Sequence, residues 1–225
     1  MAEVDGDNQA LRETWLKDLA AYPEVDYRFF HGVGPSFYPD FNLGVPVRSV
    51  DPVEPKSDVV ILDAPDDYWG LIFKSQELHR WGYQQGYDFV LKVDADTYVN
   101  MSKLMASGFE KHDYYGHVQV WPGTTRGDGT VNQHGFLNGG EGYWTSRRAC
   151  EIINEGIPRR DAKESTGEDQ WTGDILGKAG IVMVDNPGYG SGITLHGSLA
   201  TAPPEGYRPG VYKNEWMYQT YEKRT

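Results

Sequence analysis

The stretch Phe89-Val90-Leu91-Lys92-Val93-Asp94-Ala95-Asp96 carries the strongest structural signal in the chain. Its apolar run is typical of a buried strand, and the two aspartates follow where that strand ends. In open α/β sheets, ligands bind beyond the carboxyl ends of the strands. Carboxylates one residue apart at this edge can hold a hard divalent cation, with water and a substrate diphosphate completing its oxygen shell. The alternative is a pair of solvated aspartates in a turn.

The sequence on both sides of this stretch predicts an α/β fold, because helical and extended patterns alternate along most of the chain. Helices are expected at about 8–19, 67–82, 102–109, 146–154 and 167–177, and strands at 26–31, 58–63, 87–93, 114–120 and 181–184. Asp7 or Asn8 is the expected cap of the first helix, and Ser146 that of the fourth. No linker divides the chain, so we expect one domain over residues 1–225, with 201–225 packed on it as a tail.

The composition and net charge indicate which classes of protein fit this chain. The 225 residues are 39% hydrophobic, which is enough to build one sizeable core, and 33 acidic against 21 basic residues give a net charge of -12. That charge disfavours generic attraction to nucleic acid or anionic lipid, and most of the acids are expected on a solvated surface.

The cysteine count and the lengths of the apolar runs bear on where the protein acts. Cys150 is the single cysteine, which excludes an intrachain disulfide and favours a reducing compartment. No apolar run approaches the ~20 residues that cross a bilayer, and the N-terminus lacks a signal-peptide pattern. The sequence therefore predicts a soluble cytoplasmic protein without membrane contact.

Several motifs in the same order resemble those of the β-1,3-galactosyltransferase and fringe glycosyltransferases, over about residues 10 to 196. They are Arg12-Glu13-Thr14-Trp15, Asp67-Tyr68-Trp69-Gly70-Leu71 running on through Lys74 to Trp81, Phe89 to Asn100, Gly139-Gly140-Glu141-Gly142-Tyr143 and Glu168-Asp169. The resemblance implies a GT-A fold, which is a single-domain, Rossmann-like mixed sheet flanked by helices. It also implies inverting transfer of a hexose or N-acetylhexosamine from a UDP-sugar to an acceptor hydroxyl.

The resemblance assigns a cation, Mn²⁺ or Mg²⁺, to the aspartates. Asp96 is then the direct ligand, Asp94 contacts the nucleotide ribose or a metal-bound water, and His196 completes the site. Taken alone, a histidine after a short apolar run is more often a structural residue.

The resemblance also makes Asp169 the general base, which takes the proton of the acceptor hydroxyl. Glu168 would then orient a hydroxyl or simply be exposed. The simpler alternative is that both acids complement the positive N-terminus of a helix.

Donor and sugar contacts are expected from further positions. Arg12, Lys74, Asp94 and Ala95 are the candidate donor-binding residues, and Gly139, Gly140, Tyr143, Trp144 and Glu168 the candidate sugar or acceptor residues. The glycines would allow close backbone approach, and the aromatic rings would offer flat apolar faces to a sugar. A solvated lysine and arginine, and a bulged strand with core aromatics, are the alternatives.

This chain also departs from the pattern that it resembles. The resemblance leads us to expect a core strand before the Arg12 helix, whereas only Met1 to Val4 precede Asp5. This departure motivates a second hypothesis, a non-catalytic carbohydrate- or nucleotide-binding module on the same fold. A nucleotidyltransferase that uses the same aspartates is a third.

The acceptor is left open among a glycan, a protein and a hydroxylated nucleobase. A local basic cluster is compatible with a nucleic-acid acceptor, although a solvated helix face explains the cluster more simply. Its members are Arg147, Arg148, Arg159, Arg160 and Lys163. A bacterial, phage or large-virus source would suit an intracellular enzyme of this kind.

Overall fold

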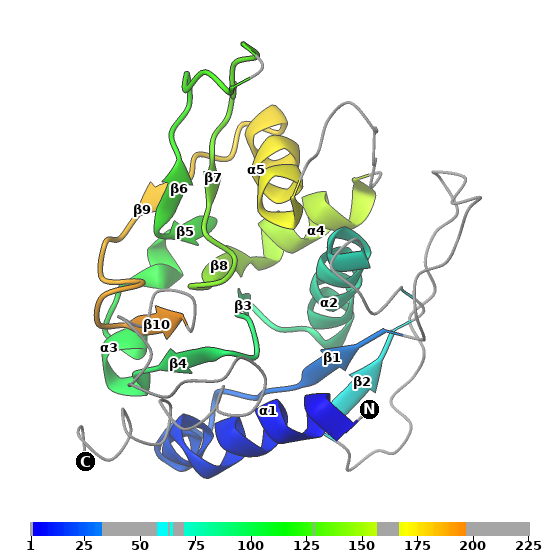
Figure 1. Cartoon of the computed structure of the whole chain (residues 1–225), viewed down its shortest axis with the longest axis vertical. Coiled ribbons are helices and arrows are strands. Elements are labelled where there is room, and N and C mark those ends of the chain that lie inside the picture. The colour runs from blue at the N-terminus through cyan, green and yellow to red at the C-terminus, as the bar shows by residue number, and fades with distance from the viewer. Residues whose placement is uncertain are drawn as a thin grey trace.

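The computed structural model describes residues 2–32, 58–62, 64, 70–127, 129–156 and 167–196, with the backbone alone for residues 2–7. Its centre is a mixed four-stranded sheet in the order β3-β8-β5-β9 (Figure 1). The strands are β3 (Phe89–Lys92), β8 (Tyr143–Ser146), β5 (Tyr114–Gly116) and β9 (Val184–Asp185). β8 is antiparallel to both β3 and β5, and β5 is parallel to β9.

Two-stranded pairs surround this sheet. β1 (Phe29–His31) is parallel to β2 (Val59–Ile61), β4 (Thr97–Val99) is antiparallel to β10 (Thr194–His196), and β6 (Val118–Val120) is antiparallel to β7 (Phe136–Leu137). β4 is the next strand after β3 along the chain, and Asp94 and Asp96 lie in the short segment between the two strands. The β4–β10 pair therefore lies beside the aspartates. This pairing positions the candidate site.

Helices cover both faces of the sheet. The helices α2 (Leu71–Gln85), α4 (Arg147–Glu155) and α5 (Glu168–Lys178) pack together on one face. On the other face lie α1 (Ala2–Glu13), the 3-10 helix η1 (Trp15–Ala21), α3 (Met101–Met105) and the 3-10 turn η3 (Phe109–Lys111). None of the helices in the described ranges is long and apolar enough to cross a membrane.

The core is divided in two by the alternation of side chains along the strands. Tyr114 and Tyr143 point to the α2–α4–α5 side, whereas their neighbours Tyr115 and Trp144 point to the α1–α3 side. Trp144 stacks on Phe109, with ring centroids 3.9 Å apart. Each strand therefore contributes to both layers of the core, as a sheet buried on both faces requires.

Several predicted boundaries are corrected. The first helix begins at Ala2 rather than after a cap at Asp7 or Asn8, and Asn8 lies buried inside α1, where its side chain contacts His31. The strand expected at 114–120 is broken at residue 117, because the chain changes its partner there from β8 to β7. Ser146 does cap α4, since its hydroxyl accepts the Ala149 N–H at 3.2 Å.

Some expected segments lie outside the described residues, and one observed strand was not expected. The predicted helix start at Asp67 and the tail at 201–225 lie outside the described residues. The strand β10 was not predicted, and the last strand of the main sheet, expected at 181–184, is the short β9 instead.

The sheet is interrupted between β1 and β3. Among the described residues no strand lies there: β1 pairs with β2 on one edge, and β3 pairs with β8 on the opposite side. A cavity of about 820 Å³ occupies this position, and residues of β1, β3, α2 and η1 line it. The core strand that the resemblance leads us to expect before the Arg12 helix is not present in the described part, where residues 2–13 are helical.

The core between α2, α4 and α5 gives a stability prediction. Ile153 on α4 is fully buried there, whereas its neighbour Ile152 is only partly buried. We expect Ile153→Ala to lower the free energy of unfolding by about 3 kcal/mol, because truncation loses apolar burial and leaves a cavity. Urea unfolding of both variants measures this. A loss from Ile152→Ala as large as that from Ile153→Ala would contradict the packing described.

Candidate functional site

Asp94, Asp96 and His196 come together at the end of β3. The Thr97 N–H donates to the Asp94 carbonyl at 3.1 Å, which closes a turn over Asp94 to Thr97 and brings both carboxylates to the same edge. In the β4–β10 register His196 lies opposite Thr97, next in sequence to Asp96. A strand pairing between segments about a hundred residues apart thus delivers the histidine to the aspartates.

The three side chains form a cluster of suitable size for a cation. His196 Nε2 lies 3.1 Å from Asp96 Oδ1 and 3.8 Å from Asp94 Oδ2, and one ligand atom from each residue lies within 4.8 Å of the others. Ligands that bind one Mg²⁺ or similar ion at about 2.1 Å stand roughly 3 to 4 Å apart. Carboxylate oxygen and imidazole nitrogen suit such a divalent cation, so the residues present fit one.

His196 is held firmly in this position. The hydrogen bond with Asp96 raises the pKa of His196, although partial burial opposes the shift, and the charges of Asp96, Asp94 and Glu141 add to it. Gly140 packs directly against the imidazole, so that a Cβ there would lie 2.8 Å from Nε2. The Gly140 carbonyl also accepts the Thr97 hydroxyl at 2.6 Å. Gly140 therefore lies directly against His196, the candidate cation ligand.

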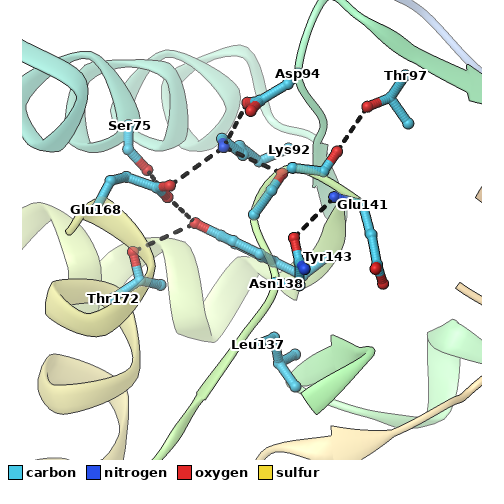
Figure 2. A network of polar contacts seen from close by, with 12 residues as sticks. Ser75, Lys92, Asp94, Thr97, Leu137, Asn138, Glu141, Tyr143, Glu168 and Thr172 are labelled. Carbon is cyan, nitrogen blue, oxygen red and sulfur yellow. Dashed lines mark hydrogen bonds and ion pairs between the residues drawn. The ribbon is translucent and has the colours of Figure 1, made fainter. Parts of the chain in front are cut away.

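A second, buried cluster adjoins the first through Lys92 (Figure 2). Its ammonium Nζ lies 2.8 Å from Asp94 Oδ1, 3.2 Å from Glu168 Oε2 and 3.1 Å from the Gly139 carbonyl. The Lys92 side chain is only 8% exposed. Burial alone would lower the pKa of Lys92, but the carboxylates around it raise that pKa above its ordinary value. Lys92 is therefore a permanent positive charge between the candidate cation site and the N-terminus of α5.

Glu168 is the ionised partner of Lys92 in this cluster. It accepts hydrogen bonds from the Ser75 hydroxyl at 2.9 Å and from the Tyr143 hydroxyl, and Tyr143 also contacts Thr172. Burial would raise the pKa of Glu168, but Lys92 and these hydrogen bonds hold it below its ordinary range.

Asp169 has the opposite character. Burial, together with the charge of the adjacent Glu168, raises the pKa of Asp169 to about 9. The Glu168–Asp169 pair therefore carries one proton near neutral pH, and Asp169 holds it. A Cβ on Gly139 would lie 2.1 Å from Asp169 Oδ1, so only glycine leaves room for this carboxyl.

The remaining predicted residues lie in different surroundings. Tyr143 and Trp144 are 0% and 6% exposed, which is the core placement that the sequence left open as an alternative. Arg12 forms an ion pair with Asp58 at 2.8 and 2.9 Å and lies over the ring of Phe29. That pair ties α1 to the start of β2.

Lys74 and Ala95 line the cavity between β1 and β3, as does Asp94. Of the predicted basic cluster, Arg147 lies over the Tyr83 ring and Arg148 pairs with Asp113. Arg159, Arg160 and Lys163 lie outside the described residues.

Sequence reasoning missed Lys92, Ser75 and the His117–Glu141 pair. Lys92 had a recognisable signal, because a charge inside an otherwise apolar strand needs a buried partner. Ser75 had none. Glu141 is 3% exposed, and its carboxylate contacts His117 Nδ1 at 2.7 Å on the side of the turn facing away from Lys92.

Comparison with known proteins identifies the family of the chain. A search of curated proteins found no significant match. The family model described as Galactosyltransferase matches residues 7–118, about half of the chain, from α1 through β5 and into β6. The matched residues include Arg12, Lys74 and the Asp94-Ala95-Asp96 segment, whereas Gly139, Asp169 and His196 follow it. On this match and this mixed α/β architecture, the chain belongs to the galactosyltransferase family of glycosyltransferases and has a GT-A fold.

Proposed function

We propose that this glycosyltransferase is a metal-dependent, inverting enzyme that moves a hexose or N-acetylhexosamine from a UDP-sugar to an acceptor hydroxyl. The observation that carries the proposal is the convergence of Asp94, Asp96 and His196 at the end of β3. Directly beside them lies the buried cluster around Asp169, which can exchange a proton. One site thus combines ligands for a cation with an acid–base group, the two parts that inverting transfer needs.

Asp96 and His196 would hold Mn²⁺ or Mg²⁺, with Asp94 beside them as a further ligand or as the partner of a metal-bound water. When bound, the cation neutralises the charge that develops on the departing diphosphate. Asp94 and Asp96 are about a third exposed, so a ligand can reach them from solvent.

The cavity between β1 and β3 is the proposed place for the nucleotide. It extends to Asp94 and Ala95 at one end, and Asn8, His31 and Lys74 contribute polar groups to an otherwise mainly apolar lining. An apolar slot with a few polar groups suits a flat base and a ribose, and Lys74 would meet a phosphate. Arg12 contributes to this arrangement indirectly, because its pair with Asp58 holds α1 against β2.

Asp169 is the proposed base. An attacking hydroxyl needs an ionised carboxylate within hydrogen-bond reach, and Asp169 lies against Gly139 at the beginning of the turn before β8. Glu168 is committed to Lys92, Ser75 and Tyr143, so its role is to orient the cluster rather than to take the proton. The acceptor itself, a glycan, a protein or a hydroxylated nucleobase, would approach from this side.

A donor screen tests the proposal. The protein is incubated with a panel of UDP-sugars with and without Mn²⁺, and mass spectrometry follows the release of UDP. We expect slow, metal-dependent release from one or two donors, because water replaces the missing acceptor. The active donor is then offered to acceptors of each class.

The other outcomes identify the alternatives. Release of pyrophosphate from a nucleoside triphosphate would make the chain a nucleotidyltransferase. Binding of UDP and Mn²⁺ without any product after long incubation, acceptors included, would make it a non-catalytic module. Either result would overturn the proposed function.

A further inference from the structure

This inference rests on the proposed function and concerns how the cation site affects the ionisation of the base. We propose that Lys92 is a positioning residue that links occupancy of the cation site to the ionisation of Asp169. In the cation-free protein its ammonium is shared between Asp94 and the Glu168–Asp169 pair. When a cation takes the charge of Asp94, the ammonium serves the pair alone, and Asp169 gives up its proton.

The contacts of Lys92 carry the proposal. Its Nζ is 2.8 Å from Asp94 on one side and 3.2 Å from Glu168 on the other, and the Gly139 carbonyl occupies a third position at 3.1 Å. An ammonium has three donors, so these contacts use all of them. Asp94 uses Oδ1 for Lys92, while its Oδ2 faces His196 at 3.8 Å. Asp94 therefore belongs to both clusters, and a cation competes with Lys92 for it.

Tyr114, Tyr143 and His79 on the buried side of the cluster are uncharged, so the charge balance there reduces to Lys92, Glu168 and Asp169, while His196 faces Asp94 and Asp96 on the exposed side. Burial raises the pKa of Tyr114 and Tyr143 well above the ordinary value and lowers that of His79 to about 4. Tyr143 and His79 lie parallel with their ring centroids 6.2 Å apart. These three neutral side chains, from β5, β8 and α2, enclose the cluster without adding charge near neutral pH.

One ammonium faces three carboxylates here, of which Glu168 and Asp169 lie in the buried part of the site and Asp94 is 38% exposed. With Asp94 and Glu168 both beside Lys92, carboxylates already outnumber the ammonium, and a third charge on the largely buried Asp169 is unfavourable. The proton on Asp169 relieves that excess. Coulomb interactions in such a site are strong because little water screens them.

A cation at Asp94, Asp96 and His196 changes this balance. It supplies two positive charges at the Asp94 end, so Lys92 no longer has to neutralise Asp94. The attraction of Lys92 for Glu168 and Asp169 is then unopposed, and the pKa of Asp169 falls. The base becomes ionised when cation and donor are in place, which favours binding of the donor before reaction of the acceptor.

Proton release on binding tests the coupling. Calorimetry of Mn²⁺ and UDP binding near pH 7, in two buffers with different ionisation enthalpies, gives the number of protons released. Any proton that His196 releases on binding the cation is common to the proteins compared, so it cancels in the difference between them. The wild type is expected to release about one more proton than Asp169→Asn, because only the wild type deprotonates Asp169. Equal release by these two proteins would overturn the coupling.

Lys92 variants show whether the ammonium is responsible. Lys92→Met is expected to lose the additional proton, whereas Lys92→Arg keeps it. Ser75→Ala is the matched control, because it removes a hydrogen bond to Glu168 and leaves every charge in place. Undiminished release by a folded Lys92→Met protein would show that the cation acts on Asp169 without Lys92 and would overturn the role assigned to it.

A second variant keeps the proposal testable if Lys92→Met does not fold. Asp94→Asn removes the competing charge in the cation-free protein, and Asp94 is 38% exposed, so the core stays intact. We expect the acid dissociation constant of Asp169 to rise by about tenfold or more in this variant. A pH titration of the infrared carbonyl band of its protonated carboxyl measures that constant. The double variant Asp94→Asn/Asp169→Asn assigns that band.

An unchanged dissociation constant would overturn the shared-ammonium argument. Failure of the proposed function is seen separately, in the donor screen, where no UDP would be released from any donor whatever the proton count on binding. Binding with unaltered protonation of Asp169 would remove the coupling alone.

Discussion

Asp96→Ala is expected to lower the rate of sugar transfer by about 10³-fold or more, because a catalytic cation contributes several kcal/mol of charge stabilisation. Asp96 Oδ1 lies 3.1 Å from His196 Nε2, so the substitution removes one proposed cation ligand and the carboxylate that orients the other. The measurement is kcat and the Mn²⁺ concentration at half-maximal rate, with the donor that the screen identifies.

Controls make the result specific to the cation. Asp96 is a third exposed, so the variant should keep the unfolding midpoint of the wild type. Glu155→Ala, which removes an exposed carboxylate at the end of α4, should retain full activity. Unchanged turnover by Asp96→Ala in the presence of a chelator would rule out the metal-dependent mechanism.

Asp169→Asn is expected to lower kcat by about 10³-fold, within the range that general bases contribute. The amide keeps the shape of the carboxyl and cannot accept the proton of the hydroxyl. Donor and Mn²⁺ binding should survive, because Asp169 lies against Gly139 and Glu168 rather than among the cation ligands. Calorimetry measures the binding, and single-turnover kinetics measure the transfer.

A neighbouring acid on the same helix serves as the control. Asp174→Asn changes a carboxylate of α5 that is not part of the buried cluster, and it should leave kcat within about twofold of the wild type. Turnover by Asp169→Asn close to that of Asp174→Asn would remove Asp169 from the base role. Loss of donor binding in Asp169→Asn would instead show that the residue acts in binding.

The elements that the sequence predicts well are those specified by short-range chemistry. The strand at 89–92 follows from a continuous apolar run, and the start of α4 follows from Ser146, whose hydroxyl needs only the next turn of backbone to act as a cap. Glu168 and Asp169 begin α5 as predicted, where acids complement the helix dipole. The beginning of α1 was misplaced, because Asn8 contacts His31 rather than capping its own helix.

The sequence by itself determined the α/β order of the elements and the position of Asp94 and Asp96 at the end of a strand, although Phe89, Val90 and Leu91 of that strand are only partly buried. Only the tertiary structure decided which groups meet there. The β4–β10 pairing brings His196 to Asp96, and Arg12 meets Asp58 across a large gap in the sequence.

Lys92 depends most strongly on the tertiary structure. Its single ammonium lies between Asp94, which follows β3, and Glu168 of α5, and burial together with the charge of Glu168 raises the pKa of Asp169. Periodicity and capping act within a few residues. Desolvation and Coulomb interactions depend on what the folded chain packs around a charge, and they therefore appear only in three dimensions.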